Sequence, residues 1–147
     1  MKVVVFSFLI TLFTGCLQDD LTPELALEKF VEARIGQAVT REFILERVTG
    51  SMRQSLENIS QEEFEKFADL RNVKNNSFKV LSKSCQNEQC FLTYSVSYLT
   101  KTGDVSTHNS VVKKIAEMVK KDGKWLIADV TNIKTYHEAL EPINPLE

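Results

Sequence analysis

A β-hairpin signal in the C-terminal half of the chain constrains the fold more than any other feature. The stretch from Val111 to Thr131, VVKKIAEMVKKDGKWLIADVT, holds two strand-like runs on either side of Asp122-Gly123. An Asp-Gly pair favours a two-residue hairpin turn, because both turn positions require a positive φ. We therefore expect this hairpin to belong to an antiparallel sheet and most of the buried residues to pack against it.

Strand patterning extends upstream of the hairpin. Between Cys90 and Tyr98, apolar residues alternate with Thr93, Ser95 and Ser97, which is typical of a strand with one buried and one solvated face. The sequence predicts four strands, over Phe78–Cys85, Cys90 to about Tyr98, Val105 to about Val119, and Lys124–Lys134. Because only short turns separate them, we expect the strands to pair in chain order as a meander.

Helical patterning dominates the region before the strands. Thr22 and Pro23 are typical of a helix start, with Thr22 as N-cap and Pro23 at the first helical position. The further predicted elements are a helix from Thr40 to Gly50, a short segment around Met52 and Leu56, a helix from the capping box at Ser60 to about Leu70, and a loop from Asn72 to Ser77. Helices followed by a meander predict an α+β fold, with N-terminal helices packed on a curved four-stranded antiparallel sheet.

The element order and the Asp122-Gly123-Lys124-Trp125 motif resemble the nuclear-transport-factor-2-like superfamily, the cystatin-like cone, over residues 22–135. Its members wrap a curved sheet around helices and often leave a pocket between them. They include ketosteroid isomerases, limonene epoxide hydrolases, polyketide cyclases, scaffolds and small lipoproteins of unknown role. The resemblance implies a cone-like domain over residues 22–135, followed by a tail at 136–147, and it leaves the activity open.

The N-terminus has the features of an export signal. Lys2 precedes an apolar run from Val3 to Leu12, which is shorter than the ~20 residues of a transmembrane helix. The run ends in Phe13-Thr14-Gly15-Cys16, which resembles the lipobox of bacterial lipoproteins, with Phe13 in place of the usual aliphatic residue. The resemblance implies a signal peptide over residues 1–15 and lipidation of Cys16, with palmitate among the acyl chains. The alternative is an ordinary secretory signal with an incidental cysteine.

A lipidated Cys16 would hold the domain at the membrane surface. Residues 16–21 form the tether, and the five residues from Leu17 to Leu21 span roughly 17 Å when fully extended. We expect a lipid-anchored domain in the cell envelope that faces the periplasm. In the lipoprotein family, Asp directly after the lipidated cysteine disfavours outer-membrane sorting, and Leu17 in that place mildly favours the outer membrane.

The two remaining cysteines, Cys85 and Cys90, predict a disulfide. An exported chain meets an oxidising compartment, where a closely spaced pair is read as a disulfide. Metal binding is the alternative, but only these two cysteines remain and the two histidines are distant in sequence. We therefore expect no metal and no cofactor.

Charge and motifs exclude several function classes. The chain has 18 basic and 20 acidic residues, which argues against a nucleic-acid-binding protein. No serine lies in a nucleophile elbow and no glycine-rich loop fits a phosphate. His108 and His137 are expected to have no catalytic or metal role. Lys120, Lys121 and Lys124 suggest a solvated turn that blocks edge association, or a weak contact with anionic lipid.

Two acids in the hairpin are candidates for proton transfer. Asp129 is expected to share a strand face with Trp125 and Ile127, where apolar walls would raise the pKa of a general base. Glu117 interrupts the partner strand, and its direction depends on the turn. The sequence leaves two pairings open. A two-residue turn places Met118 opposite Ile127 and Glu117 opposite Ala128. A three-residue turn places Glu117 opposite Ile127.

Tyr94 and Tyr98 complete the candidate residues, because both lie on the apolar face of the second strand and could donate hydrogen bonds to a ligand. The main hypothesis is a non-enzymatic envelope lipoprotein that binds a protein or a small apolar ligand, since the sequence assembles no acid–base pair. The second is an isomerase or cyclase that uses Asp129 or Glu117 with a tyrosine donor. The third is an assembly scaffold that dimerises through the polar face of the sheet.

Overall fold

The computed structural model describes residues 22–36, 39–68, 74–102 and 106–139. The elements are the helices α1 (Pro23–Gly36), α2 (Arg41–Leu45), α3 (Gly50–Asn58) and α4 (Gln61–Ala68), and the strands β1 (Lys74–Gln86), β2 (Gln89–Thr102), β3 (Ser106–Lys121) and β4 (Lys124–Ala139). The strands form one antiparallel sheet in the order β1-β2-β3-β4, so the predicted α+β plan and meander are confirmed. The predicted signal peptide, Cys16, its tether and residues 140–147 lie outside the described residues.

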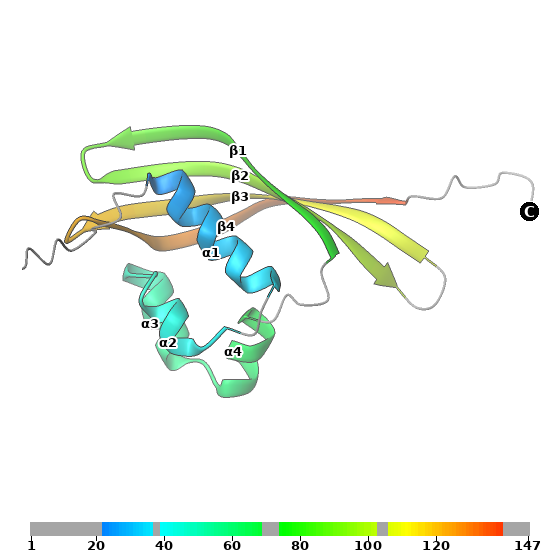
Figure 1. The fold of residues 1–147 in the computed structure, drawn as a ribbon, viewed down its shortest axis with the longest axis horizontal. Coiled ribbons are helices and arrows are strands. Elements are labelled where there is room, and N and C mark those ends of the chain that lie inside the picture. The colour runs from blue at the N-terminus through cyan, green and yellow to red at the C-terminus, as the bar shows by residue number, and fades with distance from the viewer. Residues whose placement is uncertain (1–21, 37–38, 69–73, 103–105, 140–147) are drawn as a thin grey trace, which may run out of the picture.

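The helices cover one face of the sheet over part of its length. Figure 1 shows them gathered near the β1–β2 and β3–β4 turns, while the opposite ends of the strands extend past the helices. Apolar side chains from both layers form the core, among them Leu27, Phe30, Ile44, Leu56, Phe64, Leu92, Ala116, Met118 and Ile127. The sheet therefore has a helix-facing side, which is buried near the turns, and an outer side.

The two predicted caps are present. The backbone nitrogen of Leu25 donates to Thr22 Oγ1 at 3.3 Å, which caps α1. Ser60 and Glu63 form the predicted capping box, in which Ser60 N donates to Glu63 Oε2 at 2.9 Å and Glu63 N donates to Ser60 Oγ at 3.2 Å. Both motifs are local in sequence, so they form as the sequence predicts.

The prediction of one helix from Thr40 to Gly50 is wrong. α2 ends at Leu45, and Val48 instead forms a parallel bridge with Ile127 of β4. Thr49 N donates to the Ile127 carbonyl at 2.8 Å, and Ile127 N donates to the Arg47 carbonyl at 2.9 Å. β4 is an edge strand with unpaired backbone groups, and the segment between α2 and α3 satisfies some of them.

The hairpin has the two-residue turn, with φ of 50° at Asp122 and 78° at Gly123. Met118 pairs with Ile127, as predicted for this turn. The register then shifts, and Glu117 pairs with Asp129 rather than with Ala128. Ala128 is thus an extra residue in β4, which is a β-bulge, and it reverses the faces of the residues that follow it.

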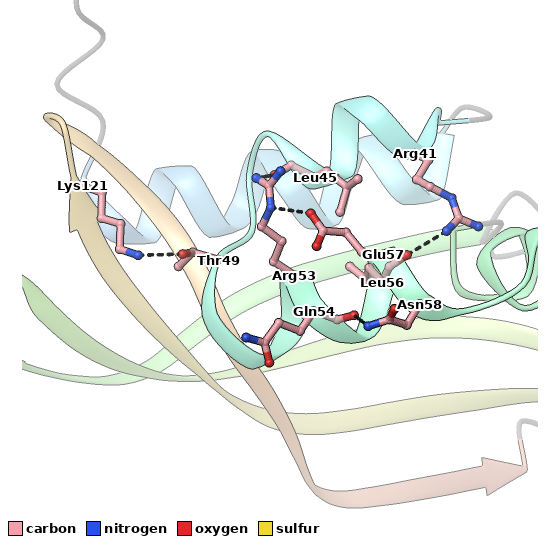
Figure 2. A network of polar contacts seen from close by, with 9 residues as sticks. All are labelled: Arg41, Leu45, Thr49, Arg53, Gln54, Leu56, Glu57, Asn58 and Lys121. Atoms are coloured by element: carbon pink, nitrogen blue, oxygen red, sulfur yellow. Dashed lines mark hydrogen bonds and ion pairs between the residues drawn. The ribbon is translucent and has the colours of Figure 1, made fainter.

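Side-chain hydrogen bonds hold the short helices together (Figure 2). Arg41 Nη1 donates to the carbonyls of Leu56 and Ile59, at 2.9 and 3.1 Å, where α3 ends. Arg53 Nη1 donates to the Leu45 carbonyl at 3.1 Å, at the end of α2. These arginines satisfy carbonyl groups that a helix end leaves without a partner.

Three strands are clearly longer than predicted. β2 continues to Thr102, opposite Ser106 of β3, rather than ending near Tyr98. β1 begins at Lys74, so the expected loop is wrong over Lys74–Ser77, and β4 continues to Ala139, so the expected tail is wrong over Tyr136–Ala139. The pairing also explains these two extensions, since Lys74 lies opposite Leu99 of β2 and Ala139 lies opposite His108 of β3. A neighbouring strand that is already in place overrides the weak strand propensity of these polar segments.

Gly50 is predicted to be required at the start of α3. It has a φ of 56°, and a Cβ there would lie 3.5 Å from the Ala128 carbonyl oxygen. That contact is ordinary, so the strain of Gly50→Ala comes from the left-handed backbone, and we expect a loss of about 1–2 kcal/mol in the free energy of unfolding. Urea denaturation measures it. Gly50→Asn should lose less, and an alanine variant as stable as the wild type would contradict the prediction.

The disulfide between Cys85 and Cys90 is formed as predicted, with 4.1 Å between the Cα atoms. It closes a short loop, so its reduction should lower the free energy of unfolding by about 2 kcal/mol at most. The β1–β2 ladder continues beyond the pair, and we expect circular dichroism to show the same strand content in the reduced protein. Complete unfolding upon reduction alone would show that the disulfide does more than close this hairpin.

Candidate functional site

The two candidate acids lie on the outer side of the sheet. Asp129 is exposed and pairs directly with Glu117, which is partly buried. Glu117 Oε1 accepts a hydrogen bond from Gln89 Nε2 at 2.7 Å. The prediction that Asp129 shares a face with Trp125 and Ile127 is wrong, because the bulge at Ala128 turns Asp129 away from the helices.

The two candidate tyrosines lie on the helix-facing side. Tyr94 is 4% exposed, and its ring centroid lies 5.5 Å from that of Phe78. Tyr98 is partly buried and lies farther along β2, toward the end that extends past the helices. The sheet therefore separates both tyrosines from Asp129 and Glu117, and it does not assemble an acid–tyrosine pair.

The helix-facing side instead brings cationic groups beside Tyr94. Lys114 of β3 pairs with Tyr94 on one side and with Asn132 of β4 on the other, so the three residues form one row across the sheet. The charge of Arg34, in the last turn of α1, lowers the pKa of both Tyr94 and Lys114, although burial outweighs this effect at Tyr94. We call Arg34, Tyr94 and Lys114 the cationic cluster.

Aromatic rings hold the guanidinium of Arg34. Its Cζ lies 4.1 Å from the ring centroid of Phe67 and 5.6 Å from that of Phe30. Arg34 Nη2 donates to the Phe67 carbonyl, whereas Nε is buried and has no hydrogen-bond partner among the described residues. Cation–π contacts and one hydrogen bond thus position Arg34 and leave donor capacity unused.

Burial shifts the pKa of each group in the cluster. It lowers the pKa of Arg34 to about 10, and it raises the pKa of Tyr94 to about 12. The pKa of Lys114 is lowered, first by burial and then by repulsion from Arg34. No carboxylate of the described residues forms an ion pair with either cation, so the two positive charges repel each other in a partly desolvated place.

Sequence patterns held a signal for both cations, although neither was predicted as a site residue. Leu27, Phe30 and Val31 form a helical stripe on α1, and the next position of that stripe is Arg34. On β3, buried Val112 and Ala116 share a face, and strand alternation puts Lys114 between them on that face. A cation at a position that the pattern reserves for an apolar residue is the signal in both cases.

The other polar candidates have local roles. Lys121 Nζ donates to Thr49 Oγ1 at 2.9 Å, so one lysine of the turn tip is held against the start of α3 (Figure 2). Ser110 Oγ and His137 Nδ1 lie 2.9 Å apart, and the side chain of His108 lies outside the described residues. Within the described ranges, no group of three or more acidic, histidine or cysteine side chains could hold a metal ion. None of the described helices is long and apolar enough to cross a membrane.

Comparisons with known proteins do not identify a family. No family model, no curated protein and no solved structure matches the chain. The resemblance to nuclear-transport-factor-2-like proteins therefore stays a proposal, and the function is inferred from the side chains of the described residues.

Removal of the Lys114 charge is predicted to stabilise the domain. Lys114→Gln replaces a partly buried cation that Arg34 repels with a neutral side chain, so its unfolding temperature at pH 7 should be higher than that of the wild type. Lys79→Gln is the matched control, because Lys79 is exposed on the outer side and loses the same charge. A larger stabilisation by Lys79→Gln would contradict the prediction.

Lys114→Gln is also predicted to change how the free energy of unfolding depends on pH. The lowered pKa of Lys114 means that the unfolded chain holds more protons at this position, so wild-type stability should rise toward the ordinary lysine pKa of 10.5. Tyr94 opposes this rise from about pH 9 upward, because its pKa of about 12 keeps the proton in the folded state, whereas Arg34, with a pKa of about 10, adds to the rise in the same range. As the pH rises toward 10.5, the slope should be smaller in Lys114→Gln than in the wild type.

Proposed function

We propose that this chain is an envelope lipoprotein whose domain is a non-enzymatic binding module with a cone-like, nuclear-transport-factor-2-like arrangement. The observation that carries the proposal is the division of polar groups between the two sides of the sheet. The acids that could move protons face outward, and the helix-facing side carries two cations without an acidic partner among the described residues. The cations on the helix-facing side can bind a ligand, and no described acid lies beside them to take a proton from it.

An isomerase or cyclase mechanism is not favoured by this division. A general base must lie within roughly 2.6–3.2 Å of the proton that it removes, and a tyrosine donor must reach the same substrate. Asp129 and Glu117 lie on the outer side, and Tyr94 and Tyr98 lie on the helix-facing side. One substrate cannot contact an acid and a tyrosine through the sheet.

A scaffold that dimerises through the outer side is also not favoured. Phe91 and Tyr136 are the exposed aromatic residues there, at 46% and 48% exposure. They pair with Glu117 and Val111 of β3, which are separated by roughly 20 Å along the strand. Ile115 lies between them, but so does a polar row that crosses all four strands, made of Lys79, Ser95, Lys113 and Lys134, and this row divides the apolar residues of the outer side.

The proposed location in the cell envelope is inferred from the sequence of residues 1–21. The apolar run and the lipobox-like end at Cys16 support export and lipidation, and the short tether supports a position at the membrane surface. The cell envelope also suits the Cys85–Cys90 disulfide, because disulfides persist in oxidising compartments.

Cys16→Ser is predicted to release the protein from the membrane fraction. Serine cannot form the thioether that carries the lipid, so the variant should lose membrane fractionation and incorporation of an alkyne-labelled palmitate. The wild type should show both when membranes are separated by density and probed with an antibody.

The double variant Cys85→Ala/Cys90→Ala is the matched control. It removes the two other cysteines and leaves Cys16 in place, so it should fractionate and incorporate label like the wild type. Unchanged membrane fractionation of Cys16→Ser would overturn the lipid anchor.

A further inference from the structure

We infer that the cationic cluster of Arg34, Tyr94 and Lys114 binds an organic anion, with a carboxylate or phosphate head at the cluster and an apolar body on the adjoining face of the sheet. This inference rests on the proposed function and names the ligand class of the binding module. The head supplies the negative charge that the described residues do not supply. The body lies toward the strand ends that extend past the helices.

Charge is the first argument. Arg34 and Lys114 are close enough for repulsion to lower the pKa of Lys114, and no described carboxylate pairs with either. Partly buried like charges destabilise a fold, whereas an anion placed beside them converts repulsion into attraction. Tyr94 adds a hydroxyl group that stays protonated, since its pKa is about 12. The cluster thus combines two cations with a neutral donor.

Unused donors are the second argument. In the helical layer, Arg41 donates to the Leu56 carbonyl, and Arg53 donates to Glu57 and to the Leu45 carbonyl (Figure 2). Arg41 also donates to two further carbonyls and to Gln61, and Arg47 donates to the Phe43 carbonyl and pairs with Glu46. Arg34 differs, because its buried Nε has no partner among the described residues and its Nη2 has one. A guanidinium binds carboxylates and phosphates through its N–H groups. Arg34 Nη1 makes no hydrogen bond with the described residues and is not among the buried atoms, so it is the donor that an anionic oxygen can reach.

Lys114 is the third argument, because packing alone explains the position of Arg34 but not that of Lys114. The rings of Phe30 and Phe67 account for Arg34 as a packed side chain, because a guanidinium stacks well on aromatic faces. The side chain of Lys114 has no such ring contact and makes no hydrogen bond with the described residues. Its partly buried ammonium is explained by an anion that approaches from the same side.

The neighbouring row of side chains offers an apolar surface to the body of the ligand. Next to the row of Tyr94 and Lys114 lies the row of Phe78, Val96 and Val112, and all three face the helical side. Phe78 and Val96 are only partly buried, and Tyr98 follows one row farther out. An apolar group that covers them removes more of this surface from water.

The experiment uses the full chain, purified and reconstituted in phosphatidylcholine vesicles. Thermal unfolding is followed by the fluorescence of Trp125, the only tryptophan of the chain. The probes are sodium hexanoate, hexyl phosphate, inorganic phosphate and uncharged hexan-1-ol, at constant ionic strength set with sodium chloride. Hexanoate, hexyl phosphate or both should raise the unfolding temperature in a saturable way, and hexan-1-ol should not. Inorganic phosphate should bind at least tenfold more weakly than hexyl phosphate.

Variants assign the effect to the cluster. Lys114→Gln should weaken binding of the active probe at least tenfold, while its unfolding temperature without any probe is higher than that of the wild type. Lys114→Arg should restore binding, because it keeps the charge, and Lys79→Gln should bind like the wild type. A general loss of structure cannot give this combination, since the variant that loses binding is the more stable protein.

Three outcomes would overturn the site. They are no saturable stabilisation by either organic anion, equal binding by Lys114→Gln and the wild type, and equal stabilisation by hexan-1-ol. Failure of the proposed function is distinct. Proton NMR of the recovered probe would show chemical conversion if the domain were an enzyme, even with the site intact, and loss of the wild type from membranes would overturn the lipid anchor whether or not anions bind.

Discussion

The backbone of β4 at Ile127 is the constraint on which the rest of the structure depends. As an edge strand, β4 leaves backbone groups unpaired, and the segment at Val48 satisfies those of Ile127 with two short hydrogen bonds. This pairing interrupts the helix that the sequence favours and starts α3 at a glycine with positive φ. The Ser51 hydroxyl then donates to the Ala128 carbonyl at 3.2 Å, so the start of α3 rests on the bulge.

The bulge at Ala128 in turn determines on which side of the sheet Asp129 lies. Without it, Asp129 would follow Ile127 onto the helix-facing side and would lie among apolar groups. With it, Asp129 faces solvent beside Glu117, and the helix-facing side keeps its cations and loses its acid. A single extra residue in an edge strand thus keeps one acid off the helix-facing side of the sheet, where Arg34 and Lys114 lie.

Features that depend on neighbours in sequence could be predicted, and those that depend on distant backbone could not. The Asp122-Gly123 turn, the box at Ser60 and the Cys85–Cys90 disulfide each need only a few residues, and the structure contains all three. The bulge at Ala128 depends on α3, far away in the chain, and no local pattern encodes it. Arg34 and Lys114 are intermediate cases, because periodicity places each one inward but only the packed layers bring them together.

The meander topology also favours formation of the sheet before the helices dock on it. Every strand pairs only with its neighbours in the chain, so the sheet can grow from its tight turns by closing short loops. The bond from Ser51 to Ala128 spans 77 residues, and docking of the helices must therefore pay a larger loop entropy. Because the chain is made from its N-terminus, the helices are made before the strands and remain without their sheet until β4 follows. The segment at Val48 therefore finds its backbone partner, Ile127, only when the last strand is present.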